Sequence, residues 1–157
     1  MLLILLSILF VMVLLLSIRF SGLTTREKHV IAILEKRNEE LLAYLIIIND
    51  PMMERLVRTY KQKTPRLTKS ISQAGYTVNK GEVIGICLND LNTNTDASFI
   101  DELYFVVLHE LAHICTTSVG HGPDFWDNFK KLREHAVQAG VWTNISDKSA
   151  VCGESLI

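Results

Sequence analysis

The chain has 157 residues, with 16 Lys and Arg against 17 Asp and Glu, and hydrophobic residues make up 48% of it. This length suits one domain of ordinary size, and the composition excludes a disordered or low-complexity chain. The net charge of −1 argues against a protein that coats nucleic acid by bulk electrostatics, although it leaves room for a local basic patch.

An uncharged apolar segment opens the chain. Residues 2–18 are all apolar except Ser7 and Ser17, and as a helix they would span roughly 25 Å at about 1.5 Å per residue. The alternative is a cleaved signal peptide, but no Lys or Arg precedes the apolar run and no small-residue cleavage pattern follows it. We therefore predict an N-terminal transmembrane anchor over residues 1–19, with residues 2–18 in the membrane.

The charges beside this segment predict its orientation. Arg19, Arg26 and Lys28 all follow the segment, and only the α-amine precedes it. The positive-inside rule then places the C-terminal domain on the cytosolic side of a single-pass protein. A virion membrane is an alternative location for the same arrangement.

The cysteines are few and far apart. They are odd in number and form no C-x-x-C pair: Cys87, Cys115 and Cys152. This spacing does not indicate a disulfide framework, and it fits a reducing compartment.

Residues 20–50 predict an amphipathic helix beside the membrane. Thr24 and Glu27 have the spacing of a capping box, and the helix should end at Asn49. Its apolar residues fall on one stripe: Val30, Leu34, Leu41, Leu45 and Ile48. The helix could pack on the following domain, which we place at residues 51–157, or form a stalk or a short dimerising coil. The oligomeric state is not decided by this pattern.

A second helix should begin at Asp50-Pro51, an N-cap and first-turn pair, and end before Pro65. Six basic residues and no acid lie in and after it: Arg55, Arg58, Lys61, Lys63, Arg66 and Lys69. Such a stretch could contact nucleic acid or anionic lipid, or simply be solvated.

The remaining elements predict a small sheet and two helices. Tyr76–Val78 and Glu82–Leu88 flank the turn Asn79-Lys80-Gly81 and should form a β-hairpin. A helix from about Ala97 to Thr117 is apolar on nearly every face, which is typical of a central, buried helix. A further helix is expected over residues 124–139, before Gly140, and then an extended, packed tail over residues 141–157. The fold class is therefore α+β.

Residues 109–113 of the buried helix read His-Glu-Leu-Ala-His, the pattern H-E-x-x-H. Because positions four apart lie on one helix face, His109 and His113 can both bind one tetrahedral Zn²⁺. Glu110 points about 100° away from His109, where it can act as a general base without being a ligand. Chance predicts only about 0.01 such patterns in a chain of this composition.

A catalytic zinc site needs a third protein ligand. The strongest candidate is His121, in a Gly-His-Gly-Pro turn just after the helix, and Glu134 ranks below it. His29 and His135 are expected to be ordinary surface histidines. A structural zinc site would use several cysteines, whereas Cys115 should face away from the histidines, so we favour a catalytic site with one open position.

The segment VVLHELAHICTTSVGHGPDFW resembles the active-site region of the WLM and SprT-like (Spartan-type) zinc metallopeptidases. These families combine H-E-x-x-H with a third His that is often followed by Gly and then by an aromatic residue, here His121, Gly122 and Phe125. The resemblance implies a minimal zincin-like domain with zinc-dependent endopeptidase activity. Better-known members cleave proteins crosslinked to DNA, and small membrane-anchored versions resemble proteins of large DNA viruses.

We therefore predict a membrane-anchored zinc endopeptidase that acts on polypeptides, with Glu110 as catalytic base and His109, His113 and His121 as metal ligands. One alternative is a non-catalytic membrane or virion component that keeps the zinc site as a scaffold. Another is a protease that acts on protein–DNA crosslinks, with the basic stretch on the phosphates. The strand Val83–Leu88 is expected to be an edge strand that pairs with substrate, and the loop Asn89–Thr95 could gate the cleft.

Overall fold

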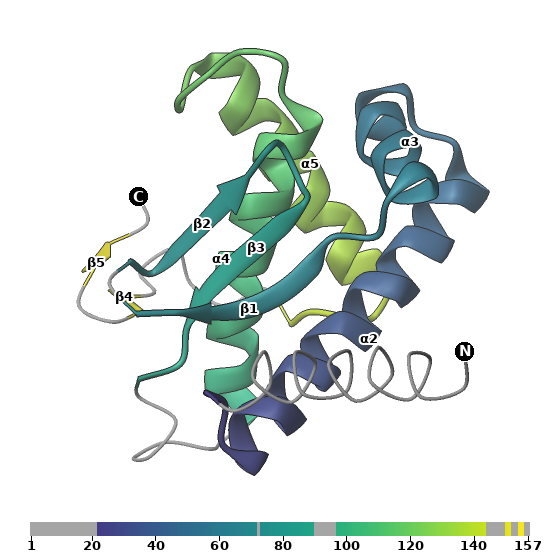
Figure 1. Ribbon diagram of the computed structural model, residues 1–157. Coiled ribbons are helices and arrows are strands. Elements are labelled where there is room, and N and C mark those ends of the chain that lie inside the picture. The colour runs from purple at the N-terminus through teal and green to yellow at the C-terminus, as the bar shows by residue number, and fades with distance from the viewer. Residues whose placement is uncertain (1–21, 72, 90–96, 144–149, 152–153, 156–157) are drawn as a thin grey trace, which may run out of the picture.

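The computed structural model of the chain describes residues 22–71, 73–89, 97–143, 150–151 and 154–155. It has both helices and a small sheet, so the predicted α+β class is confirmed (Figure 1). In chain order the elements are α2 (Thr25–Ile48), η1 (Pro51–Met53), α3 (Glu54–Gln62), β1 (Arg66–Ser70), β2 (Gly75–Val78), β3 (Val83–Cys87), α4 (Ala97–Cys115), α5 (Pro123–Gln138), β4 (Ala150–Val151) and β5 (Glu154–Ser155). The anchor predicted over residues 1–19 and most of the loop 89–95 lie outside the described residues. Within the described ranges, no helix combines the length and apolarity that crossing a bilayer requires.

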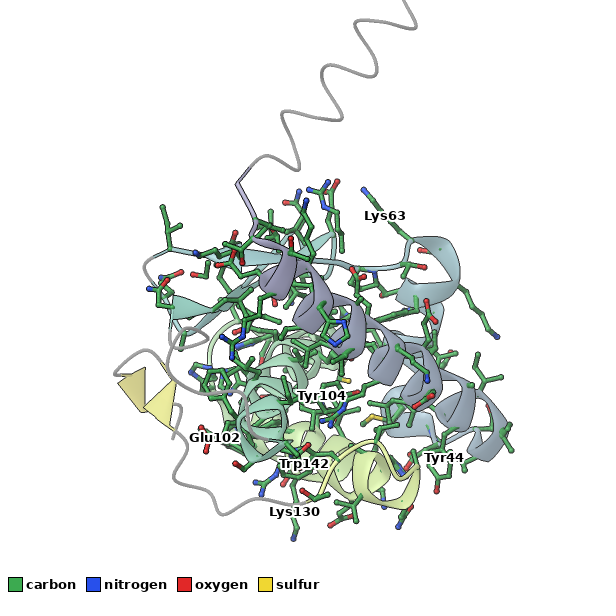
Figure 2. The ribbon with its side chains drawn as sticks, turned by 90° about the horizontal axis from the view of Figure 1, so that it is seen from below. Tyr44, Lys63, Glu102, Tyr104, Lys130 and Trp142 are labelled. Carbon is green, nitrogen blue, oxygen red and sulfur yellow. The ribbon has the colours of Figure 1, made fainter. Side chains whose placement is uncertain are left out.

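Helix α4 is the central element, as its all-round apolar sequence predicts. It contacts α2, α3, α5, β2 and β3, and the sheet lies across one side of it (Figure 1). Tyr104 and Phe105 are both fully buried in its middle, and Figure 2 shows Tyr104 in the interior. Because neighbouring elements enclose α4, any polar side chain that it carries is largely removed from water.

The predicted hairpin is confirmed as β2 and β3. The two strands pair antiparallel, with Thr77 opposite Ile84, and the turn places Asn79 and Lys80 at φ values of 49° and 51°. A hairpin turn that twists with its strands requires positive φ at both central residues, which Asn adopts more readily than most residues.

The expectation that Val83–Leu88 forms an edge strand is wrong. The strand order is β1-β3-β2, so β3 lies between two neighbours and β2 is an edge strand. Part of the basic stretch forms β1, which pairs parallel with β3. Leu67 and Ser70 of β1 are buried, 4% and 1% exposed. Because they are three positions apart, their burial does not follow the two-residue alternation by which a sequence indicates a strand.

Helix α2 packs on the rest of the fold. This was one of the two alternatives predicted for it, the other being a stalk or a short dimerising coil. Its capping box is present, since the Glu27 amide donates to Thr24 Oγ1 at 3.2 Å and the Thr24 amide donates to the Glu27 carboxylate at 2.6 Å. Four residues of its apolar stripe are buried: Val30, Leu34, Leu41 and Leu45. Arg37 also donates to the buried Asp101 of α4 at 2.6 Å, which ties the two helices together.

The spacing of the cysteines did not indicate a disulfide framework and fitted a reducing compartment, yet Cys87 is disulfide-bonded. Cys115 is free and buried, and its Sγ lies 3.9 Å from Met53 Sδ. The number of cysteines and their distances along the sequence do not show which cysteines lie close in space, so they did not predict this disulfide. A structural disulfide is typical of an oxidising environment.

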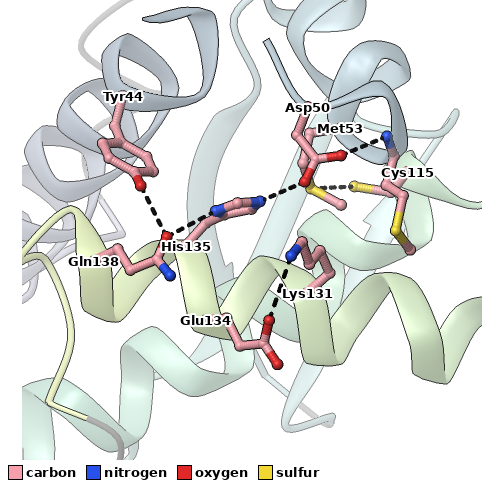
Figure 3. Close-up of polar contacts among 9 residues, drawn as sticks. Tyr44, Asp50, Met53, Cys115, Lys131, Glu134, His135 and Gln138 are labelled. Atoms are coloured by element: carbon pink, nitrogen blue, oxygen red, sulfur yellow. Dashed lines mark hydrogen bonds and ion pairs between the residues drawn. The ribbon is translucent and has the colours of Figure 1, made fainter. Parts of the chain in front are cut away.

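The prediction that His135 lies on the surface is also wrong, whereas His29 is exposed as expected. His135 is 5% exposed because the inner face of α5 packs against η1 and α2. Its Nε2 lies 2.8 Å from Asp50 Oδ2, as Figure 3 shows. The other oxygen of Asp50 accepts a hydrogen bond from the Met52 amide at 2.9 Å. The N-cap of η1 is thus also the partner of a buried imidazole.

Because the hydrogen bond from His135 lowers the pKa of Asp50, this pair should stabilise the fold in a pH-dependent way. A carboxylate with a lowered pKa stabilises the folded state at pH values above its unfolded pKa of about 3.9. This stabilisation disappears as the pH falls through the folded pKa. Asp50→Asn keeps a good N-cap but loses the charge. We expect it to cost about 1 kcal/mol at pH 7 and less at pH 3, in urea unfolding of metal-free protein. Asp127→Asn on the exposed side of α5 is the control and should change neither value; equal losses for Asp50→Asn at both pH values would contradict the assignment.

Helix α5 spans nearly the predicted range, and Gly140 after it has a φ of 71°, as the expected stop requires. The predicted extended tail is partly described: Val141 and Trp142 are buried, and β4 pairs antiparallel with β5. The Trp142 indole donates to the carbonyl oxygen of Asp101 at 3.1 Å, so the start of the tail packs on α4.

Candidate metal centre

The two histidines of the H-E-x-x-H pattern lie on the side of α4 that is exposed to a cleft. Their ring centroids are 5.2 Å apart, one helical turn from each other. His109 is only 4% exposed, and His113 is half-buried nearer the end of the helix. The 3.6-residue period brings both rings to one face, as the sequence predicted.

His121 comes back to this face from the segment between α4 and α5. Its ring centroid lies 4.9 Å from those of both His109 and His113. Gly120, with a φ of 88°, lets the backbone turn here into a conformation that other residues rarely adopt. The three predicted ligands are therefore brought together, and their ligand nitrogens all lie within 4.8 Å of one another.

The spacing and chemistry of these nitrogens fit a tetrahedral zinc ion. His109 Nε2 lies 3.0 Å from His121 Nε2, and two nitrogens bound at zinc's usual bond length are about 3.3 Å apart. Burial, and then the neighbouring histidines, lower the pKa of His109 to about 3. Burial, then His121 and Lys80, lower the pKa of His113 to about 4. Both rings are thus neutral near pH 7, which is the form that binds a metal.

Glu110 lies beside this triad and is 5% exposed. Burial raises its pKa to about 7, although a hydrogen bond from Thr77 opposes the shift. Thr77 Oγ1 donates to Glu110 Oε2 at 2.6 Å. A carboxylate that titrates near neutral pH can both accept and return a proton, which is what a general base requires.

Strand β2 shapes the surroundings of this carboxylate. A Cβ atom on Gly75 would lie 2.7 Å from Glu110 Oε1 and 2.6 Å from Val106, so only glycine allows the strand to approach α4 so closely. Thr77, two residues on, points to the same side and holds the other oxygen of Glu110. Sequence reasoning missed both residues, because no pattern within the hairpin indicates which helix it will contact.

A cleft of about 430 Å³ runs between β2, α4 and the segment after α4. Both chemical groups open into it, the Glu110 carboxylate and the three imidazoles. Its lining is Gln73, Gly75, Tyr76, Thr77, Lys80, His109, Glu110, His113, Ser118, Val119, Gly120 and His121. The first five of these come from β2 and its two flanking turns, so the hairpin forms one wall.

Aromatic residues of α5 support the triad from behind. The Phe125 ring is fully buried, and its centroid lies 4.9, 4.5 and 4.6 Å from those of His109, His113 and His121. Trp126 lies 5.8 Å from His121 on the more exposed side. These rings limit the orientations that the imidazoles can take, so the ligands are pre-arranged by packing.

The other candidate groups lie apart from the triad. Glu134, the second choice for third ligand, is exposed on α5 and lies 3.6 Å from Lys131 (Figure 3). Of the basic stretch, Lys63 is paired with Glu82 at 2.5 Å and Lys69 with Glu27 at 2.7 Å. These two pairs reduce the positive charge that the stretch could offer to a phosphate backbone.

Comparisons with known proteins show which family the chain resembles. The model of the WLM domain matches residues 53–156, which is more than half of the chain. Uncharacterized protein 136R of Invertebrate iridescent virus 6 is 36% identical over 69 residues, or 43% of this chain and 38% of the viral protein. Uncharacterized protein 042R of Invertebrate iridescent virus 3 is 36% identical over 72 residues, or 45% of this chain and 43% of that protein. The chain thus spans less than half the length of either relative, and no solved structure matches it.

Proposed function

The chain belongs to the WLM-domain family, and on this premise we propose that it is a zinc-dependent endopeptidase anchored in a membrane. The ion is held by His109, His113 and His121, and Glu110 is the general base. One observation carries the proposal: three imidazoles have their ligand nitrogens within 4.8 Å of one another, in the cleft that also holds a buried carboxylate. That set leaves one coordination position open, as catalytic zinc sites do.

The residues of the chain divide the reaction between them. Zinc, when bound, acts as a Lewis acid that polarises the scissile carbonyl group and makes a water molecule more acidic. Glu110 takes the proton of the attacking water and delivers it to the leaving amine, a role that suits a pKa of about 7. Thr77 holds the carboxylate in one orientation through its hydrogen bond to Oε2.

Substrate binding is assigned to strand β2. It is an edge strand and lines the cleft, so one row of its backbone groups is available for pairing. An extended polypeptide can add to such an edge through main-chain hydrogen bonds, which demand little of its side chains. The substrate class is therefore an unfolded or extended polypeptide, and the preference for particular residues is broad.

The anchor and its orientation are part of the proposal. Residues 2–18 hold the domain at a membrane, and Arg19, Arg26 and Lys28 favour its cytosolic side. The alternative location, a virion membrane, would suit the disulfide at Cys87, because disulfides persist in oxidising surroundings. The similarity to two iridescent virus proteins supports a viral setting, and the resemblance to SprT-like peptidases supports cleavage within a polypeptide rather than at its ends.

Metal removal tests the proposal. We expect the purified full chain to contain one zinc ion and to cleave an unstructured protein such as casein. A chelator such as 1,10-phenanthroline should abolish cleavage, and stoichiometric zinc should restore it, because the three imidazoles are the binding site. The same chelator with excess zinc already present is the control and should have no effect. If the chain binds zinc but cleaves nothing, the non-catalytic scaffold is the alternative that remains. If the chain binds no zinc, the proposed metal site is wrong.

A further inference from the structure

Of the three imidazoles, that of His121 is the one that belongs to no helix or strand. It belongs to residues 116–122, between the end of α4 and the start of α5. Thr117, Ser118, Val119, Gly120 and His121 are all exposed, and Val119 is 93% exposed. Burial of apolar side chains therefore does little to hold this segment. The rings of Phe125 and Trp126 contact the His121 imidazole itself, and polar contacts order the backbone that precedes it.

Three of these contacts come from the tip of the β2–β3 hairpin. Lys80 Nζ donates to three successive carbonyl oxygens, those of Thr116 at 3.3 Å, Thr117 at 2.9 Å and Ser118 at 3.4 Å. An ammonium group has three donors, so one side chain can satisfy all three oxygens. These carbonyls follow the C-terminus of α4, where the helix dipole also favours a positive charge.

The hairpin tip is itself fixed on α4, so Lys80 starts from a rigid base. Gly81 has a φ of 109°, and a Cβ atom there would lie 2.6 Å from Ile114 Cδ1. The turn thus presses against the last part of α4, which carries His113. One rigid unit then contacts both the helix with two of the imidazoles and the segment with the third.

We propose that Lys80 is a positioning residue for the metal centre. Its ammonium group binds the carbonyl groups of residues 116–118 and so holds the segment that presents the His121 imidazole to His109 and His113. This inference rests on the zinc site of the proposed function. By holding the segment before the metal arrives, Lys80 reduces the conformational entropy that metal binding would otherwise have to remove. Two further contacts hold the same segment: Ser118 Oγ donates to Asp124 at 2.5 Å, and Asn128 donates to Thr116 at 3.2 Å.

Zinc affinity is the test, measured on the full chain by competition with a chromogenic chelator. Lys80→Met removes the donors and keeps most of the side-chain length, and we expect it to weaken zinc binding about tenfold, as loss of supporting contacts around a metal site does. Lys80→Arg should restore most of the affinity, because a guanidinium group can also bind several carbonyls. Lys130→Met is the matched control; Lys130 is exposed on α5, away from the hairpin (Figure 2), and its loss should leave the affinity unchanged.

A double-mutant cycle separates positioning from a general loss of structure. In a His121→Ala background, Lys80→Met should weaken zinc binding no further, because the imidazole that Lys80 positions is already gone. The same tenfold loss in both backgrounds, or no loss in either, would overturn the inference. Lys80→Gln, which is shorter and neutral, is measured beside Lys80→Met, so that a folding defect in one variant leaves the other to decide.

The same measurements distinguish this inference from the proposed function. If His121→Ala weakens zinc binding and Lys80→Met does not, only the role of Lys80 is lost. If zinc binds as described but no polypeptide is cleaved, the proposed activity fails and the positioning role is unaffected. If the unmodified chain binds no zinc, both fail together.

Discussion

Replacing Glu110 with glutamine is expected to abolish polypeptide cleavage while zinc stays bound. Glutamine has nearly the same shape, so the buried side chain can keep its place beside Thr77 and Gly75. Its amide cannot accept a proton from water at neutral pH, so the variant lacks the general base. Because acid–base catalysis of this kind contributes factors of about 10²–10⁴, we expect kcat to fall at least 100-fold.

The measurement has two parts, kcat on a quenched fluorescent peptide and zinc content of the same sample. Glu134→Gln is the matched control, since Glu134 is exposed on α5 and paired with Lys131, and its kcat should equal that of the unmodified chain. Cleavage by Glu110→Gln at the normal rate would remove the carboxylate from the mechanism. Loss of zinc from Glu110→Gln would instead give it a role in metal binding.

Replacing His121 with alanine should greatly weaken zinc binding and, with it, cleavage. Two imidazoles of α4 would remain, and His121 Nε2, which lies 3.0 Å from His109 Nε2, would be lost. Because even contacts outside the ligand shell change affinity by about 10–100-fold, the loss of a ligand should cost at least 100-fold. Chelator competition measures this directly.

His29→Ala is the control for the loss of an imidazole, because His29 is exposed on α2 and does not line the cleft. It should leave zinc affinity as it is. If His121→Ala bound zinc as tightly as the unmodified chain, His121 would not be the third ligand. The zinc affinity of Glu134→Gln, the control variant for Glu110→Gln, would then test Glu134 as the second candidate ligand.

The elements with strong periodic or terminal signals were predicted well. Helix α4 was predicted as buried because nearly every face is apolar, and α2 was predicted from its capping box and stripe. The hairpin followed from two β-rich runs around Asn79-Lys80-Gly81. Each of these signals is local, since a helix or a hairpin is formed by residues close together in the chain.

The errors all concern neighbours distant in the sequence. Strand β1 was missed, and β3 was taken for an edge strand, because which strand lies beside which is not encoded in either strand alone. His135 was taken for a surface residue, because its partner Asp50 is 85 residues away and the polar residues around it on α5 suggested a solvated face. The wide spacing of the cysteines likewise gave no sign that Cys87 is disulfide-bonded.

The metal-binding pattern itself could be read without coordinates, because His109, Glu110 and His113 lie within a single turn of one helix and the helical period sets how their side chains diverge. His121 was within reach by the same reasoning, since it follows the end of that helix by a few residues. Only the folded chain brought β2 to α4, and with it Thr77 and Gly75 to the carboxylate and Lys80 to the carbonyl groups before His121. These contacts join residues more than 30 positions apart, so they arise from packing of whole elements against α4 and leave no trace in local periodicity.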